Sequence, residues 1–240
     1  MLERMPSWAA ALPATLHRLL LRREKQVALP VRKDLWYVFP PGMFSPPLVG
    51  WRDENYFRVL KPERGKTVLS VGAFLGGSAI EALQRVGRQG LVVAIEPEPR
   101  NLRYLRMNLS RFPNSVVVPK AVSDRRGRVL LHRSPTISGT HSILIPRGGD
   151  CIEVEADTLD HICAELGLEE IGFMMMDVEG AEVKALRGAR ETLKRAEKVV
   201  VGAYHIVGGK PTWPVVRRML ERAGFRTIVT EDGLVHAWRL

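Results

Sequence analysis

From residue 66 onward, continuous apolar runs alternate with segments that repeat apolar residues at helical spacing. The apolar runs predict strands at residues 67–71, 91–96, 115–119, 172–177 and 198–203. Helices are predicted between and after these runs, at residues 78–86, 99–110, 158–166, 180–195 and 212–223. Apolar strands that alternate with amphipathic helices are typical of a doubly wound α/β fold with a mostly parallel sheet, and this is the predicted fold class.

The end of the chain carries a different pattern. Residues 226–230 and 234–239 are short runs that meet at Asp232-Gly233, a dipeptide that favours a hairpin turn. We therefore expect the two runs to close the sheet as an antiparallel pair. Earlier in the chain, residues 128–132 and 151–155 predict extra strands or a hairpin, joined by a polar link.

Residues 1–60 are predicted to form an N-terminal extension, and residues 61–240 the main domain. Leucines at helical spacing, followed by basic residues, predict a basic helix within residues 1–33. Such a helix packs on the main domain or contacts a membrane surface or RNA. Residues 34–62 are dense in prolines and aromatic residues, which predicts an ordered but mostly irregular collar. The collar either closes over a substrate pocket or fastens the N-terminus to the core.

Composition adds information on charge and compartment. The formal net charge is +10, which favours contact with polyanions or reflects an arginine-rich proteome. Cys151 and Cys163 follow neither a zinc-ligand nor a disulfide pattern. Because the sequence shows no apolar run of membrane-spanning length and no signal-peptide pattern, a cytoplasmic protein without a membrane span is expected.

Glycines follow the first strand at once. Gly72, Gly76 and Gly77 lie between the run at 67–71 and the helix that follows it. A strand that turns into a helix through glycines leaves backbone N–H groups uncovered and lets a ligand approach the main chain. The sequence therefore predicts a nucleotide-type cofactor site at the carboxyl edge of the sheet. The spacing G-x-x-x-G-G differs from the G-x-G-x-x-G of dinucleotide binding.

Several short motifs occur in one order along the chain. They are VGAFLGG at 71–77, IEP at 95–97, AVSD at 121–124, TLD at 158–160, DVEGAE at 177–182 and LRGA at 186–189. In these motifs the chain resembles the FkbM-like S-adenosylmethionine-dependent methyltransferases, over about residues 51–240. The resemblance implies the class I methyltransferase fold, which has seven strands with an antiparallel last strand. It also implies S-adenosylmethionine as the cofactor.

Each part of that cofactor makes a separate demand on the site. Expected cofactor contacts are Ser70, Gly72, Ala73, Phe74, Gly76, Gly77, Glu96, Pro97, Ala121, Val122, Ser123, Asp124 and Asp177. Glu96 ends the second strand, where a carboxylate can accept two hydrogen bonds from the ribose diol. Residues 121–124 offer an apolar slot and polar acceptors to the adenine, although they also suit a turn. Ser70 stands where related enzymes commonly carry an acid.

The predicted catalytic residues are Asp177, His205 and Glu179. Asp177 and His205 follow the fourth and fifth strands, where a base is useful to a hydroxyl acceptor. Asp177 is also suited to cap the next helix, and Glu179 and Glu182 suit a helix N-terminus. His141 is a weaker candidate. Asp177, Glu179 and a histidine are also able to hold a divalent metal, but no spacing demands one and no metal site is predicted.

Oxygen is the favoured methyl acceptor, since the Pro-Pro-aromatic motif of amine-directed enzymes and a nucleophilic cysteine are absent after the fourth strand. The first hypothesis is therefore methyl transfer to a hydroxyl of a sugar, glycan or small polar molecule. The second is RNA methylation, with Arg125, Arg126, Arg128, Arg133 and Arg147 around the cleft. A binding protein without turnover is a third, and a nicotinamide oxidoreductase fits least well. The chain is expected to be a monomer or a homodimer.

Overall fold

The structure, a computed structural model, describes residues 27–32, 35–40, 53–135 and 139–239. Most of the predicted basic helix and part of the collar lie outside these residues. The chain divides into two compact units, Met1–Pro46 and Pro47–Leu240. In the first unit, β1 (Val27–Arg32) pairs antiparallel with β2 (Leu35–Phe39). β2 lies within the predicted collar and is a run of strand-forming residues, LWYVF.

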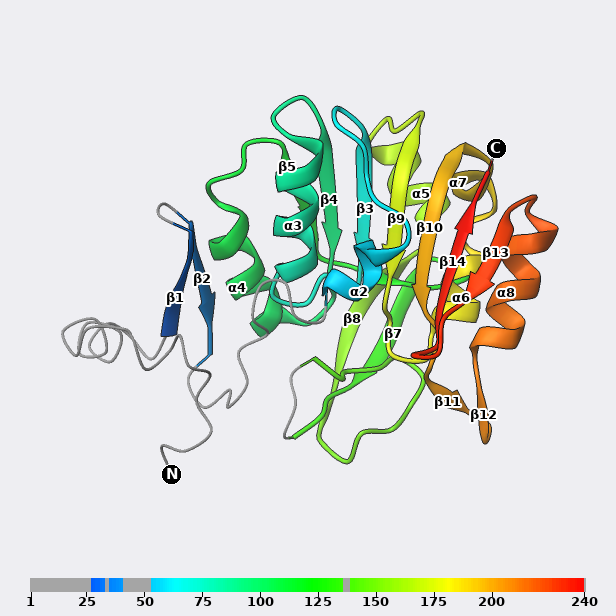
Figure 1. Cartoon of the computed structure of the whole chain (residues 1–240). Coiled ribbons are helices and arrows are strands. Elements are labelled where there is room, and N and C mark those ends of the chain that lie inside the picture. The colour runs from blue at the N-terminus through cyan, green and yellow to red at the C-terminus, as the bar shows by residue number, and fades with distance from the viewer. Residues whose placement is uncertain (1–26, 33–34, 41–52, 136–138, 240) are drawn as a thin grey trace. The chain divides into compact units, whose positions relative to one another are not determined.

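The second unit is built on a seven-stranded sheet with the order β13-β14-β10-β9-β3-β4-β5 (Figure 1). Its strands are β3 (Thr67–Val71), β4 (Leu91–Ile95), β5 (Ser115–Val118), β9 (Ile171–Met176), β10 (Ala196–Gly202), β13 (Arg226–Val229) and β14 (Leu234–Trp238). Only β14 runs against its neighbours, since it pairs antiparallel with both β10 and β13. The predicted fold class is confirmed.

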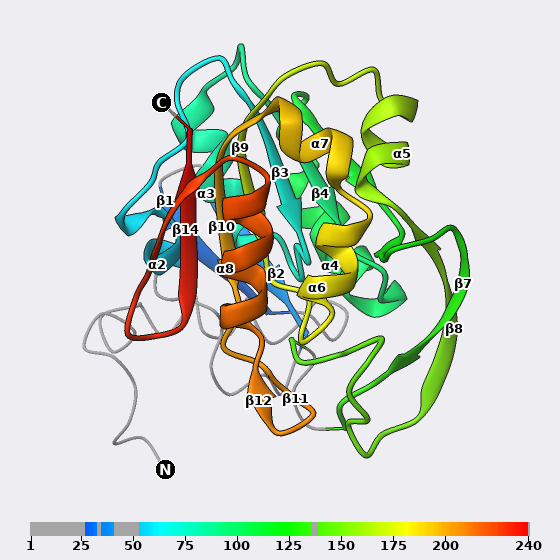
Figure 2. The ribbon, with the colours of Figure 1, turned by 90° about the vertical axis from the view of Figure 1, so that its right-hand side faces the viewer.

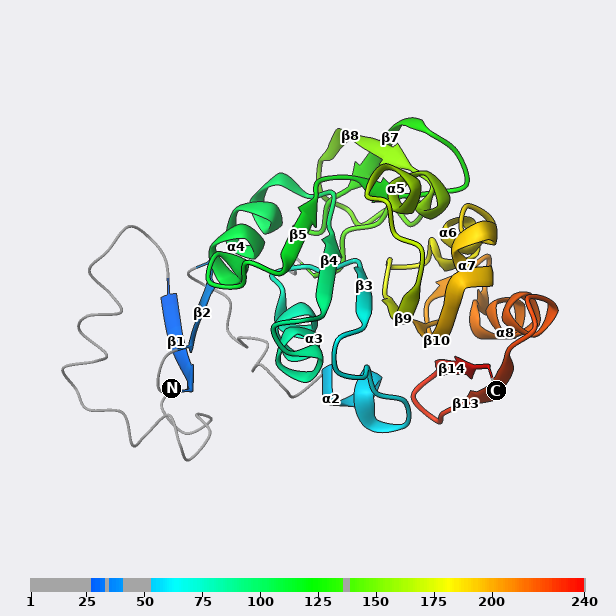
Figure 3. The same ribbon diagram turned by 90° about the horizontal axis from the view of Figure 1, so that it is seen from above.

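Helices cover both faces of this sheet, as the view from above shows (Figure 3). One face carries α2 (Asp53–Arg58), α3 (Gly77–Val86) and α4 (Pro99–Leu109). The opposite face carries α5 (Leu159–Glu165), α6 (Glu182–Arg187), α7 (Arg190–Arg195) and α8 (Trp213–Arg222), which Figure 2 shows side-on. All six residues of β9 are buried, as a strand covered on both faces requires.

The single helix predicted at residues 180–195 was wrong. The structure breaks it into α6 and α7 at Gly188. The Gly188 main chain lies against Ser123, so that an added Cβ would stand 2.2 Å from the Ser123 carbonyl oxygen. The Gly188 carbonyl accepts a hydrogen bond from Asp160 N at 3.0 Å instead of continuing a helix. A contact with a distant part of the chain therefore ends a pattern that is helical locally.

A smaller sheet, ordered β6-β8-β7, lies beyond the carboxyl ends of the main strands (Figure 1). It consists of β6 (Ala121–Val122), β7 (Gly127–His132) and β8 (Cys151–Asp157). β7 and β8 form the expected antiparallel hairpin. A short hairpin of β11 (Ile206–Val207) and β12 (Lys210–Pro211) follows β10, where the sequence predicted only a loop. Every described helix is too short or too polar to cross a lipid bilayer.

Candidate active site

The register of the parallel strands brings the predicted site residues to one edge of the sheet. Val71, the last residue of β3, pairs with Ile95 of β4 and with Met176 of β9. Met176 in turn pairs with Val201 of β10. Gly72, Glu96 and Asp177 therefore leave their strands at the same level, and the turn that ends in His205 begins one strand further along.

The turn after β3 depends on Gly72. Its φ of 79° is one that side-chain-bearing residues rarely adopt. An added Cβ would also stand 1.8 Å from the Asp177 carbonyl oxygen, so no side chain fits there. Phe74, two residues later, has a φ of 52° without being glycine. The turn thus leaves a cradle beside the main chain, as the approach of a cofactor requires.

Glu96 is buried against this turn. Its Oε2 accepts a hydrogen bond from Phe74 N at 2.9 Å, and its Oε1 accepts from Glu98 N at 3.0 Å and from Asn101 Nδ2 at 3.3 Å. Burial raises the pKa of Glu96 to about 7, even though these three hydrogen bonds oppose the shift. These hydrogen bonds hold the carboxylate in one orientation and leave one lone pair, on Oε2, for a ligand.

A pocket opens between these elements. Seven of its lining residues are expected cofactor contacts, namely Gly72, Phe74, Glu96, Pro97, Ala121, Val122 and Asp177. Glu179 and His141 line the same pocket. Its wall also includes Asn101, Leu131 and Ile143, which the sequence did not single out. One cavity thus joins the turn after β3 with the carboxylates after β9.

The remaining predicted contacts lie outside the pocket wall. Ala73, Gly76 and Gly77 form the buried turn and the start of α3. Ser70 is 1% exposed, and its Oγ lies 3.4 Å from Ser78 Oγ. The nearby acid of α3, Glu81, pairs with Arg85. Ser123 is buried, its N–H donates to Asp157 O at 2.9 Å, and Asp124 is exposed. Cofactor contacts by these residues stay predictions.

Asp177 is gripped by two tyrosines. Its Oδ2 accepts hydrogen bonds from Tyr56 OH at 2.6 Å and from Tyr204 OH at 2.7 Å. Burial raises the pKa of the Asp177 carboxyl, which His205 opposes and Glu179 reinforces. The helix-capping role considered for Asp177 is excluded, because the residue at the N-cap of α6 is Ala181. The Asp177 carboxylate therefore does not cap that helix, and Asp177 lines the pocket.

His205 lies within a ring of carboxylates. Its Nε2 lies 3.3 Å from Glu179 Oε2 and 3.6 Å from Asp177 Oδ1, and its Nδ1 lies 2.9 Å from Glu182 Oε1. Burial lowers the pKa of His205, but the three carboxylates outweigh burial and raise it to about 10. A proton on this ring is therefore held tightly, and a catalytic role of His205 stays a prediction.

Glu179 is fixed by both its main chain and its side chain. Its φ of 53° is uncommon for a residue with a side chain. Ser142 Oγ donates to the Glu179 carbonyl oxygen at 2.6 Å, and Arg147 Nη2 lies 2.7 Å from Glu179 Oε2. Residues 139–150 are thus fastened to the site through Glu179.

His141 has a defined tautomer. Its Nδ1 accepts a hydrogen bond from Ser134 N at 2.9 Å, which leaves the proton of the neutral ring on Nε2. Burial lowers the pKa of His141 and so favours that neutral form. His141 is therefore suited to donate a hydrogen bond into the pocket and is not suited to accept a proton there.

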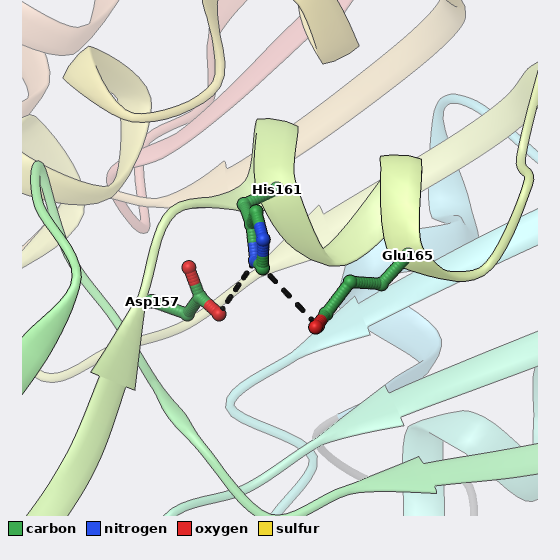
Figure 4. A group of neighbouring side chains, drawn as sticks. All are labelled: Asp157, His161 and Glu165. Atoms are coloured by element: carbon green, nitrogen blue, oxygen red, sulfur yellow. Dashed lines mark hydrogen bonds and ion pairs between the residues drawn. The ribbon is translucent and has the colours of Figure 1, made fainter.

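A second cluster of ionisable side chains lies at the start of α5 (Figure 4). His161 Nδ1 lies 2.9 Å from Asp157 Oδ2 and 3.5 Å from Glu165 Oε2. Lys120 Nζ already pairs with both carboxylates, at 2.8 Å and 3.0 Å. Burial alone raises the pKa of Asp157, but Lys120, Thr158 N and His161 together lower it. A lysine ammonium thus serves as the cation of this cluster.

Sequence reasoning missed the two tyrosines that hold Asp177. Tyr204 immediately precedes His205, so its place at the end of β10 was a signal that could have been used. Tyr56 gave no such signal, because it lies 121 residues from Asp177 and only the fold brings the two together. Arg147 had been assigned to polyanion contact, whereas the structure pairs it with Glu179.

Comparison with known proteins gives the family. The methyltransferase FkbM domain matches residues 70–227. The 2-O-methyltransferase NoeI of Sinorhizobium fredii is 32% identical over 146 residues, which cover 53% of this chain and 59% of NoeI. The chain therefore spans less than two thirds of that relative.

Comparison with solved structures also finds similar chains. The Methanococcus jannaschii fibrillarin pre-rRNA processing protein is similar with a TM-score of 0.51 at 14% identity, over 91% of each chain. Aeropyrum pernix fibrillarin, solved with bound S-adenosyl-L-methionine, has a TM-score of 0.48 at 12% identity, over 74% of this chain and 67% of its own. The family match spans most of the sheet and the pocket described above, and by it this chain belongs to the FkbM methyltransferases.

Proposed function

We propose that this chain transfers the methyl group of S-adenosylmethionine to a hydroxyl oxygen of a sugar, glycan or other small polar acceptor. One observation carries the proposal: a single pocket is lined at one part by Gly72 and Glu96 and at another by the carboxylates of Asp177 and Glu179. The similarity to NoeI, a 2-O-methyltransferase, supports oxygen as the acceptor atom. We also propose residues 61–240 as the catalytic domain.

The residues present fit the cofactor. Gly72 lines the pocket at the turn after β3, where the amino-acid tail would lie along the main chain. Glu96 keeps one lone pair on Oε2 for a ribose hydroxyl, and Ala121 and Val122 supply apolar wall for the adenine. When bound, the cofactor supplies an electrophilic methyl group, so that an O–C bond forms as the C–S bond breaks and S-adenosylhomocysteine leaves. The chain must then orient the hydroxyl and take up its proton.

Asp177 is the residue we assign to the hydroxyl. Its Oδ2 is occupied by Tyr56 and Tyr204, whereas its Oδ1 is buried and accepts no hydrogen bond from any described residue. In the metal-free chain, such an oxygen is suited to accept a hydrogen bond from an acceptor hydroxyl. Because burial raises the pKa of this carboxyl, it is also a better proton acceptor than an exposed aspartate.

The basic residues near the cleft argue for a small acceptor over RNA. Arg133 pairs with Asp150 and Glu98, and Arg147 pairs with Glu179. Arg128 likewise pairs with Glu153. An arginine already paired with a carboxylate contributes less to phosphate binding than an unpaired one. RNA methylation and cofactor binding without turnover therefore become outcomes of the test.

The test compares methyl incorporation from labelled S-adenosylmethionine into sugar and glycan extracts with incorporation into total RNA. We expect label in the carbohydrate fraction. Asp177→Asn should abolish that incorporation and keep cofactor binding, whereas Glu96→Ala should lose cofactor binding. Glu165→Gln in α5 is the matched control and should change neither. Label found only in RNA, or in no fraction while the cofactor binds, would overturn the proposal.

A further inference from the structure

The charges around His205 do not balance without a cation. Three carboxylates, those of Asp177, Glu179 and Glu182, face this imidazole, and Arg147 pairs with one of them. With a protonated imidazole the group carries three negative and two positive charges, a net charge of about −1, and with a neutral imidazole the net charge is about −2. Carboxylates at such short range require a compensating positive charge.

Three donor atoms of this group lie close together, and one of them, Glu179 Oε2, also pairs with Arg147 Nη2 at 2.7 Å. His205 is 8% exposed, and neither of its ring nitrogens makes a well-aligned hydrogen bond with a described residue. Asp177 Oδ1 is buried and unpartnered in the same sense. His205 Nε2, Asp177 Oδ1 and Glu179 Oε2 all lie within 4.8 Å of one another.

The spacing of these atoms suits a common metal ion. His205 Nε2 lies 3.3 Å from Glu179 Oε2 and 3.6 Å from Asp177 Oδ1. Two ligands that bind one ion at about 2.1 Å, at roughly a right angle or a little more, lie about 3 to 3.5 Å apart. The pairs therefore need only a small adjustment to bind the same ion.

The surrounding contacts are those that hold metal ligands in place. His205 Nδ1 lies 2.9 Å from Glu182 Oε1, and a ligating histidine commonly directs its second nitrogen to a carboxylate. Glu182 is fully buried and is itself held by Gly180 N at 2.8 Å and Thr212 Oγ1 at 3.1 Å. On the other side, the two tyrosines occupy Asp177 Oδ2 and leave Oδ1 to the ion.

We propose that Asp177 Oδ1, Glu179 Oε2 and His205 Nε2 bind a divalent cation of the Mn²⁺ or Zn²⁺ type at the wall of the pocket. Mixed carboxylate and imidazole donors suit these ions better than Mg²⁺, which takes oxygen ligands. Three protein ligands leave coordination positions open, and Asp177 and Glu179 line the pocket. The cluster of Asp157, His161 and Glu165 offers similar donors, but there Lys120 pairs with both carboxylates, whereas Arg147 pairs with one of the two carboxylates proposed as ligands.

The role of the ion in methyl transfer rests on the proposed function, whereas its binding does not. A hydroxyl bound at an open position would lose its proton more readily, because the cation stabilises the alkoxide. The proton would pass to solvent water, since Asp177 Oδ1 is then a ligand. The new O–C bond forms as the C–S bond of the cofactor breaks, which yields a methyl ether and S-adenosylhomocysteine.

The experiment titrates the full chain with Mn²⁺, without cofactor or acceptor, and follows the loss of the free-ion signal by electron paramagnetic resonance. We expect one ion per chain, displaced by Zn²⁺. His205→Gln and Asp177→Asn should each weaken binding by about tenfold or more. His161→Gln removes the histidine of the second cluster and should leave the affinity unchanged. Circular dichroism melting checks that each variant is folded.

Absence of Mn²⁺ binding by the folded wild-type chain would overturn the inference. So would a loss of affinity caused by His161→Gln and not by His205→Gln, because the ion would then lie in the other cluster. The two proposals fail separately. If the chain binds Mn²⁺ but transfers no methyl group to carbohydrate, the proposed metal site stands and the proposed acceptor is wrong. If the chain binds no Mn²⁺ and methyl incorporation into carbohydrate persists in the presence of a chelator, only the proposed metal site is wrong.

Discussion

Gly72 and Asp177 are in main-chain contact, so that a Cβ on residue 72 would stand 1.8 Å from the Asp177 carbonyl oxygen. The contact follows from the sheet, in which Asp177 N donates to Val71 O at 2.9 Å at the end of β3. Main-chain contacts thereby hold the turn after β3, which we assign to the cofactor, next to Asp177, which we assign to the methyl acceptor. The distance between donor and acceptor groups is set by the two adjacent strands and not by a mobile loop.

Gly72→Ala tests this relationship. We expect the free energy of unfolding to fall by about 3 to 5 kcal/mol, because the two strand ends must separate to admit a methyl group. Binding of S-adenosylmethionine should be lost with it. Urea denaturation and calorimetric titration measure the two effects.

The control is Gly65→Ala. Gly65 has a φ of 75°, close to the 79° of Gly72, but an added Cβ there meets nothing within 4 Å. Its substitution should cost only the backbone strain, about 1 to 2 kcal/mol. Equal losses in the two variants would show that backbone strain, and not contact with Asp177, makes Gly72 necessary.

Glu96 should make stability depend on pH. Burial raises its pKa to about 7 from a model-compound value of 4.5, although hydrogen bonds from Glu98 N, Asn101 and Phe74 N oppose the shift. The folded chain therefore holds this proton more tightly than the unfolded chain. The contribution of Glu96 to the free energy of unfolding falls as the pH rises from about 4.5 to about 7, by about 3 kcal/mol, and is level above that.

Glu96→Gln removes this titration. In the cofactor-free chain, the free energy of unfolding of the variant relative to the wild type should increase between pH 5 and pH 7. Urea denaturation at a series of pH values measures the difference. Parallel profiles for the two proteins would show that the Glu96 carboxyl titrates in the folded chain as it does in the unfolded chain.

The main sheet could be predicted because its signal is local. β9 is six consecutive apolar or small residues buried on both faces, and a continuous apolar run of that length predicts a covered strand without any tertiary information. The antiparallel closing pair was equally readable, since Asp232-Gly233 prescribes its turn. Strand ends then gave the level at which Glu96 and Asp177 emerge.

The parts that could not be predicted depend on contacts between distant residues. The helical pattern at residues 180–195 continues through Gly188, and only the approach of Ser123 ends the helix there. The partners of Asp177 are equally invisible to local patterns, since Tyr56 lies 121 residues away. The charge of Arg147 was evident, but its pairing with Glu179 depends on how residues 139–150 fold back.

Removing one tyrosine hydroxyl at a time should separate stability from activity. Tyr204 is 40% exposed, so Tyr204→Phe should change the free energy of unfolding by less than about 1 kcal/mol. It should lower kcat by about tenfold, because the Asp177 carboxylate loses one of two bonds that orient it. Tyr56 is buried, and Tyr56→Phe should also cost about 1 to 2 kcal/mol of stability.

Steady-state kinetics and urea denaturation of both variants provide the measurements. Tyr104→Phe in α4 is the matched control for loss of a buried tyrosine hydroxyl away from Asp177. Full kcat in both Tyr204→Phe and Tyr56→Phe would show that the orientation of Asp177 does not limit the reaction.

Substitution of Ser142 should weaken binding of the acceptor more than it slows the methyl-transfer step. It is 1% exposed, its Oγ donates to the Glu179 carbonyl at 2.6 Å, and it accepts from Leu144 N at 3.1 Å and Ile145 N at 3.0 Å. Ser142→Ala leaves these buried groups without that partner, so the free energy of unfolding should fall by about 2 kcal/mol. The uncommon φ of 53° at Glu179 also loses a restraint, so the carboxylate at the pocket wall becomes less well fixed.

A less well fixed Glu179 should raise the KM for the acceptor several-fold while kcat changes little, because Asp177 keeps both of its tyrosine partners. The matched control is Ser110→Ala, which removes an exposed hydroxyl that donates to Met107 O at 2.8 Å at the end of α4. It should leave KM, kcat and stability unchanged. If Ser142→Ala lowered kcat and left KM unchanged, Glu179 would belong to the reacting centre itself, and its fixed main chain would serve the methyl-transfer step instead of acceptor binding.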